Sequence, residues 1–113
     1  MDVTHLPDLV DELLAAAREA HSGRAAHTLY GNSAHHLRQT VIALAAGHSL
    51  SEHNSPGEAT LQVLTGRVTL VADDDRWDGV VGDLAAVPDT RHSLLAQDDS
   101  VILLTVITGP QHP

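Results

Sequence analysis

The chain has 113 residues and carries six arginine and lysine residues against fifteen aspartate and glutamate residues, for a formal net charge of −9. Such an acidic chain is repelled by phosphate backbones, and its single Trp and single Tyr offer no platform for stacked bases, so we expect no nucleic-acid partner. The absence of cysteine excludes disulfides and cysteine zinc sites. With no apolar stretch of the ~20 residues that span a membrane and no signal-peptide pattern, a cytoplasmic protein without membrane contact is expected.

The first predicted element is an amphipathic helix within residues 1–23. Apolar residues recur at helical spacing from Leu6 to Ala17 and form one stripe. Pro7 suits the first turn of a helix, and Gly23 suits the residue that ends one. We expect residues 1–23 to pack as a helix on a β-domain at residues 24–113, or on a partner subunit.

Short runs rich in Val, Leu, Ile and Thr follow, separated by turn signals, which is the pattern of an antiparallel sandwich or barrel. The predicted strands lie within residues 25–30, 35–46, 48–53, 58–72 (two strands around Thr65-Gly66), 73–79, 83–88, 92–96 and 99–107. Because Gly66 separates two apolar strands, we expect a tight hairpin there with a positive φ at the glycine.

The strand within residues 37–46 is apolar on both faces. Arg38 and Gln39 are neighbours on it, so one of the two side chains must face the interior of the barrel. An inward Arg38 would make a pocket that binds carboxylates, whereas an inward Gln39 would make a neutral one. The residues that face the same way as Arg38 are largely apolar, and so are those that face the same way as Gln39. The pattern therefore does not decide which of the two points inward.

Two segments carry regularly spaced glycine, proline and histidine residues: Gly47, His53 and Gly66 in the first, and Gly82, Pro88 and His92 in the second. This spacing, from about residue 37 to residue 107, resembles the two motifs of the cupin superfamily, at the level of small single-domain bacterial cupins. The resemblance implies an all-β fold, the antiparallel double-stranded β-helix or jelly-roll barrel, preceded here by one helix. Cupins commonly pair through their sheets, which, with the doubly apolar strand, predicts a homodimer.

The cupin metal site usually comprises three histidines and one glutamate that point into the barrel. His53 and His92 match two of the histidines, whereas Ser55 stands where another is expected. Glu58 lies one residue before the position of the glutamate, which Ala59 occupies. The resemblance therefore implies His53 and His92 as pocket residues and as candidate ligands for a divalent metal such as Fe, Mn, Ni or Zn.

Strand parity tests the remaining candidate ligands. If the strand is regular beyond His53, Leu61 faces inward, while Glu58 and Gln62 face outward. A bulge at residues 56–57 would reverse this and add Glu58 or Gln62 to the site. The apolar inward row favours the regular strand.

Three hypotheses for function follow. The first, which the incomplete ligand set favours, is a protein that binds a small molecule in its barrel without turnover. The second is a metal-dependent cupin enzyme of the dioxygenase or isomerase type with an atypical ligand set. The third is a non-catalytic structural or interaction domain. Fold alone does not separate them.

Overall fold

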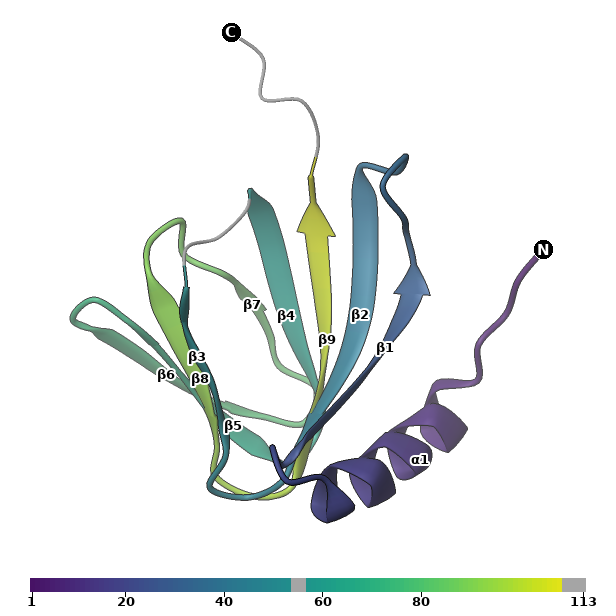
Figure 1. Ribbon diagram of the computed structural model, residues 1–113. Helices are drawn as coiled ribbons and strands as arrows, with labels where there is room; N and C mark the ends of the chain where they lie inside the picture. The colour runs from purple at the N-terminus through teal and green to yellow at the C-terminus, as the bar shows by residue number, and fades with distance from the viewer. Residues whose placement is uncertain (54–56, 109–113) are drawn as a thin grey trace, which may run out of the picture.

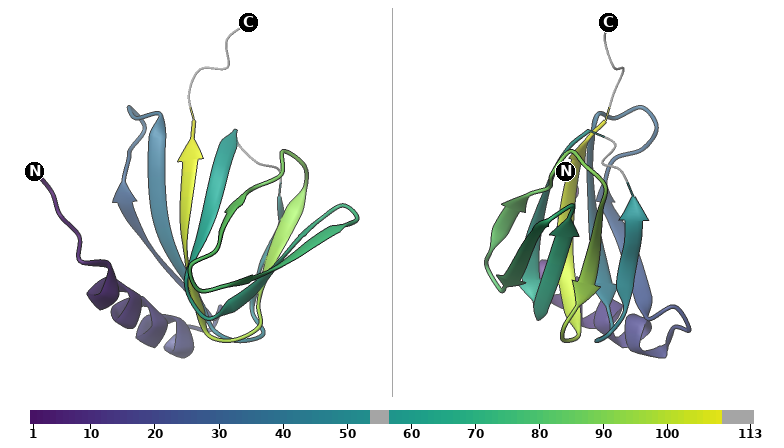
Figure 2. Two further views of the ribbon diagram at one scale, coloured as in Figure 1. Left: turned by 180° about the vertical axis from the view of Figure 1, so that it is seen from behind. Right: turned by 90° about the vertical axis from the view of Figure 1, so that its left-hand side faces the viewer.

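The chain folds into two antiparallel sheets that face each other, with one helix outside the larger sheet (Figures 1 and 2). The computed structural model describes residues 1–53 and 57–108, and at Glu52 and His53 it describes the backbone alone. The elements in chain order are α1 (Leu6–Glu19), β1 (Arg24–Tyr30), β2 (Leu37–Leu44), β3 (Ser49–His53), β4 (Glu58–Thr65), β5 (Arg67–Ala72), β6 (Asp75–Val80), β7 (Leu84–Ala86), β8 (His92–Ala96) and β9 (Ser100–Ile107).

The larger sheet has the strand order β1-β2-β9-β4-β7 and the smaller sheet the order β3-β8-β5-β6. This arrangement confirms the predicted antiparallel jelly-roll class with one preceding helix. In the described part of the chain the two sheets share no strand, so they form an open sandwich instead of a fully closed barrel. Within the same ranges, no helix has the combination of length and apolar character that crossing a membrane requires.

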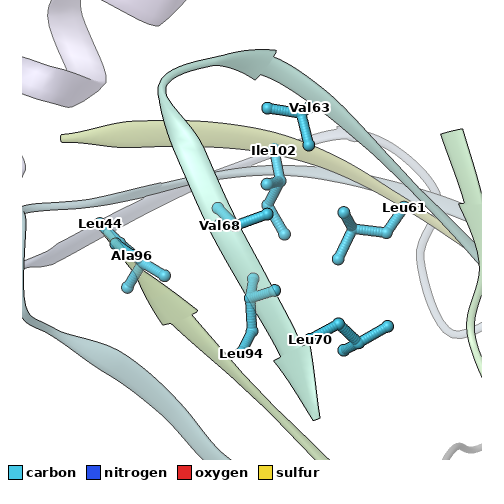
Figure 3. Packing of buried hydrophobic residues seen from close by; sticks show 8 residues of the cluster. All are labelled: Leu44, Leu61, Val63, Val68, Leu70, Leu94, Ala96 and Ile102. Atoms are coloured by element: carbon cyan, nitrogen blue, oxygen red, sulfur yellow. The ribbon is translucent and has the colours of Figure 1, made fainter. Parts of the chain in front are cut away.

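Strand β9 is the centre of the larger sheet, because it pairs with β2 on one side and with β4 on the other. Its register with β2 is regular over eight consecutive pairs, from Leu37↔Ile107 to Leu44↔Ser100. Alternate residues therefore project to opposite faces along the whole of β2. The inner face packs against the smaller sheet, and Figure 3 shows the core cluster that results: Leu44, Leu61, Val63, Val68, Leu70, Leu94, Ala96 and Ile102.

Helix α1 covers part of the outer face of the larger sheet. Its buried residues Leu9, Leu13 and Ala17 form a second core cluster with Val41, Ala43 and Val101. The double apolar pattern of β2 therefore has a cause within the chain, since one face meets the other sheet and the second face meets α1. This pattern no longer argues for a partner subunit, and the homodimer stays a prediction.

The end of α1 differs from the sequence-based expectation. The helix stops at Glu19, and the backbone of Ala20 is already extended, so Gly23 does not cap it. Gly23 instead occupies a turn before β1 with a φ of +68°, and its missing side chain leaves room for the ring of His48. The glycine serves close packing at this point as well as the turn.

Gly66 connects the two sheets, and the predicted hairpin at this position is wrong. Strand β4 belongs to the larger sheet and β5 to the smaller one, so Gly66 is a one-residue crossing between them. The expected positive φ is confirmed at +83°. A Cβ at Gly66 would clash with the carbonyl oxygen of Asp99 and with Ser100, so the crossing also depends on close backbone contact.

A carboxylate joins three segments at the same end of the sandwich. Asp99 accepts a hydrogen bond from the backbone N–H of Ala46 at 2.8 Å and another from Nε of Arg18 in α1 at 2.7 Å. These contacts lower the pKa of Asp99 below its ordinary value. The hydrogen bond from Ala46 has the largest effect, and the one from Arg18 the next largest. The ionised carboxylate thus ties the helix to the connections between the strands.

We predict that replacing Gly66 by Ala destabilises the protein more than replacing Gly47 by Ala. Both glycines have a similar positive φ, +83° and +85°, so both substitutions incur the left-handed backbone cost of about 1–2 kcal/mol. A Cβ at Gly47 meets open space, whereas one at Gly66 meets backbone, which adds roughly 1 kcal/mol or more. Urea unfolding of both variants measures the difference, and equal losses would contradict the crowded crossing.

We predict that Asp99→Asn makes the free energy of unfolding depend less on pH in the acid range. Because the folded-state pKa of Asp99 lies below 3.8, its contribution is present above the unfolded pKa and is lost as the pH falls through the folded value. The free energy of unfolding should therefore decline below about pH 5 in the wild type and less steeply in the variant. Asp74→Asn removes the same charge from an exposed turn and should keep the wild-type slope in urea titrations.

Candidate functional site

The end of the sandwich where β2 and β4 begin and β9 ends is referred to below as the open end, because the two sheets diverge toward it (Figure 1). The register of the larger sheet aligns the inner-face residues there into rows. The first row is Arg38, Val106 and Ala59, and the second row is Thr40, Leu104 and Leu61. Their inward direction follows from their parity with Ile42, Ile102 and Val63, which pack in the inter-sheet core.

Burial along this inner face changes with distance from the open end. Leu44, Ile102 and Val63 are at most 1% exposed, so the sheets are fully packed at their level. Thr40, Leu104, Val106 and Ala59 are only half-buried, and Arg38 is exposed. Solvent therefore reaches the inner face of the larger sheet over its first two rows.

The smaller sheet presents His92 at the same end. His92 and Ala72 are paired neighbours on β8 and β5, and Leu94 and Leu70 form the next pair below them. Leu94 and Leu70 belong to the inter-sheet core, so His92 shares their inward parity, and it is 7% exposed. The backbone register places His53 opposite His92, while the His53 side chain lies outside the described residues.

A hydrogen bond orients the ring of His92. Its Nδ1 lies 2.8 Å from the carbonyl oxygen of Thr90. A carbonyl oxygen can only accept, so Nδ1 carries the hydrogen, and in the neutral ring the lone pair is then on Nε2. This arrangement is the one that metal-binding and proton-transferring histidines use to set their tautomer.

The structure decides between Arg38 and Gln39. Arg38 has the inner-face parity of Ile42 and Leu44, whereas Gln39 has the outer-face parity of Val41 and Ala43. On the outer face Nε2 of Gln39 donates a hydrogen bond to Oγ1 of Thr105 at 3.3 Å. Arg38 and His92 are therefore the sequence candidates that share the space between the sheets, and Gln39 is outside it.

The structure does not bring Glu58 and Gln62 to His92. Strand β4 pairs regularly with β9 from Glu58 to Val63, and its register shift comes only between Val63 and Thr65. Leu61 and Val63 face the inter-sheet core, so Gln62 and the exposed Glu58 have the opposite parity. Ser55, which stands where a histidine is expected, and the first residue of the proposed bulge at residues 56–57 lie outside the described residues. Among residues 1–53 and 57–108, no group of three or more histidine, aspartate or glutamate side chains is placed to hold a metal ion.

Sequence reasoning missed Trp77 as a residue of the interior. Trp77 pairs with Leu70 across β6 and β5 and packs against the inter-sheet core. Its ring lies over Gly79, where a Cβ would clash with the indole. The signal was a tryptophan two residues before a glycine on one strand, so that both have the same parity and the small residue makes room for the large one. As the only tryptophan, it reports on this space by fluorescence.

Tyr30, His35 and His36 have structural roles near the open end. The rings of Tyr30 and His35 stack with centroids 4.8 Å apart and planes 10° from parallel. Nδ1 of His36 lies 2.9 Å from the carbonyl oxygen of Thr108 and donates to it. These contacts hold the connection between β1 and β2 against the end of β9.

Two surface hollows of about 330 Å³ each lie away from the inner face. One is bordered by Arg67, Arg76, Asp78, Val80 and Gln97, and the other by Leu6, Pro7, Val10 and Leu64 beside α1. In the first, Nε of Arg67 is 2.8 Å from Asp98 and Nε of Arg76 is 3.4 Å from Asp78. The guanidinium groups there already have anionic partners, and the second hollow is mostly apolar.

Comparison with known proteins supports a fold assignment. No family model and no curated protein matches the sequence. A conserved protein of unknown function from Streptococcus pyogenes superposes with a TM-score of 0.71 at 25% identity, covering 80% of this chain and 79% of that chain. A cupin superfamily protein from Desulfitobacterium hafniense gives a TM-score of 0.70 at 21% identity, covering 76% and 78%.

An enzyme is also among the similar structures. The salicylate 1,2-dioxygenase from Pseudaminobacter salicylatoxidans gives a TM-score of 0.73 at 21% identity, with 88% of this chain and 33% of the dioxygenase chain covered. A likeness at this identity concerns architecture, and this chain spans about a third of that enzyme. With the two sheets, the preceding helix and these superpositions together, this chain is a small protein of the cupin fold.

Proposed function

We propose that this cupin-fold chain binds a small molecule between its two sheets at the open end. The observation that carries the proposal is the solvent-accessible inner face, where Arg38, Val106 and Ala59 lie above a second row that ends at the buried Leu61. Deeper on the same face Ile102 is only 1% exposed, so the solvent-accessible part of the inner face is confined to the open end.

The composition of the two inner faces supports a ligand with polar and apolar parts. Leu61, Leu70 and Leu94, at 3%, 5% and 3% exposure, form an apolar floor. Above this floor lie small residues, Ala59 and Ala72, together with few polar groups. Binding sites for small molecules have this composition, a mostly apolar lining with a few fixed polar groups.

His92, together with His53, is the proposed polar group on the smaller sheet. Support comes from the 2.8 Å hydrogen bond that orients the ring of His92 and from the backbone register that pairs it with His53. The ring of His92, oriented by this bond, gives the smaller sheet a polar group at the open end.

The metal-dependent enzyme is the weaker hypothesis. The Nδ1 contact of His92 suits a metal ligand, but catalytic metal sites in proteins generally use three protein ligands. In the described ranges, Glu58 and Gln62 have outer-face parity, and no cluster of three suitable side chains is present. The described donor set does not fit a Fe, Mn, Ni or Zn centre of the usual cupin type, so we derive no reaction step through a metal.

We predict that benzamide and hexanamide, as neutral probes, shift the methyl NMR signals of Leu61, Leu104 and Val106 in a saturable way. The exposed methyl groups of Leu84, 65% exposed on the outer face, should not respond. Ala59→Leu should fill the inner row and weaken this binding, whereas Thr60→Leu, one residue away on the outer face, should leave it unchanged. Shifts at Leu84 alone, or no difference between the two variants, would rule out binding between the sheets.

We predict that the protein purified without a histidine tag contains substoichiometric metal by mass spectrometry. A metal that bound only the folded state would raise the melting temperature by mass action. Because we expect no such binding, added Mn, Fe, Ni or Zn salts should leave the melting temperature unchanged. A full equivalent of metal, together with a thermal shift that disappears in His92→Ala but persists in His48→Ala, would instead support the metal-dependent enzyme.

A further inference from the structure

We infer that the ligand bound between the sheets is a small carboxylate with an apolar body, and that Arg38 binds its carboxylate group. The inference rests on the proposed function, because it requires a ligand at the open end. It adds the chemical class of that ligand and the residue that selects it.

The charge of Arg38 is the first support. Other arginines of the described ranges are paired with aspartates: Arg18 with Asp99 at 2.7 Å, Arg67 with Asp98 at 2.8 Å and Arg76 with Asp78 at 3.4 Å. Within the part of the chain that the structure describes, the guanidinium of Arg38 forms no hydrogen bond or ion pair. In a chain of net charge −9, an unpaired cation on the inner face is the place where an anion is attracted instead of repelled.

The position of Arg38 is the second support. Its Cα and Cγ lie close to Gly31, whose missing side chain makes the space that the arginine stem occupies. The stem is thus held at its base by the connection between β1 and β2, while the head remains exposed. A guanidinium held in this way offers two parallel N–H donors, which match the two oxygens of a carboxylate.

The rows below Arg38 define the rest of the ligand. Thr40 and Leu104 lie one row deeper on the inner face, about 7 Å along the strands, and the buried Leu61 is in the same row. A carboxylate at Arg38 therefore places an attached ring or short alkyl chain on this apolar row. One guanidinium, in a chain of net charge −9, matches the charge of a carboxylate better than that of a doubly charged phosphate.

The test compares acids with the amides of the same shape. Benzoate and benzamide, and hexanoate and hexanamide, are titrated into the 113-residue protein, and binding is followed by methyl NMR of Leu61 and Leu104 and by Trp77 fluorescence. Because a hydrogen bond to a charged group is worth more than a neutral one, each acid should bind roughly 10-fold or more tightly than its amide at low salt. The preference should shrink as salt is added.

Two variants make the assignment specific. Arg38→Gln should remove the preference for acid over amide, or reverse it, because the remaining net charge repels anions. Arg24→Gln removes another exposed arginine, at the start of β1 and opposite Leu44, at the end of the sandwich away from the open end. This variant should keep the wild-type preference. Arg38→Lys keeps the charge but loses the paired donors, so it should retain only part of the preference.

The outcomes separate this inference from the proposed function. Equal binding of acid and amide to the wild type, or an acid preference that survives Arg38→Gln, would overturn the inference and leave binding between the sheets intact. If neither acids nor amides shift the methyl groups of Leu61 and Leu104, the proposed function fails, and the inference fails with it. Acid binding that shifts only residues around Arg67 and Arg76 would place the anion in the outer hollow and overturn the inference as well.

Discussion

The hydrogen-bonded register of β9 between β2 and β4 determines which side chains reach the space between the sheets. Side chains alternate strictly along a strand, so a slip of one residue in this pairing would exchange the two faces completely. Arg38 would then turn outward and Gln39 inward, and Val41 would leave the cluster beneath α1. The inter-sheet core, the docking of the helix and the polar residues of the open end therefore all depend on one backbone pairing.

One end of the sandwich provides stability, and the open end provides access for solvent. At the end opposite the open end, Gly66 carries the chain from one sheet to the other against the backbone of Asp99, and the Asp99 carboxylate joins α1 to the strand connections. The inner-face side chains there are fully buried, as Leu44 at 1% exposure illustrates. Because packing at this end and beneath α1 holds the sheets together, the opposite end does not need to close.

Much of the fold could be predicted from the sequence, because short alternating runs and turn residues mark each strand where it occurs. The orientation of Arg38 and Gln39 could not, because α1 covers the outer face of β2 and makes both of its rows apolar. Alternation carries information only when one face meets water. The hairpin predicted at Gly66 failed for a related reason, since a positive φ allows a sharp turn but does not say whether the flanking strands pair or separate into different sheets. The inward direction of Leu61 and Val63 could be predicted, because that row continues into the core. The single regular strand assumed from His53 to Val63 is wrong, since His53 ends β3 in the smaller sheet and Leu61 lies on β4 in the larger one.

The contrast between the two inner ends also bears on the choice between a binding protein and a purely structural domain. A structural sandwich gains stability from each apolar side chain that it buries, by about 25 cal/mol per Å² of apolar area, and this favours large residues in every inner row. The first rows here hold Ala59, Ala72 and Arg38 instead, above a floor of buried leucines. These small residues bury less apolar area than large ones would. Beside the exposed guanidinium they leave room for a ligand with a polar group and an apolar part. A ligand with a carboxylate and a small apolar body would restore the missing burial and supply the missing counter-charge in one step.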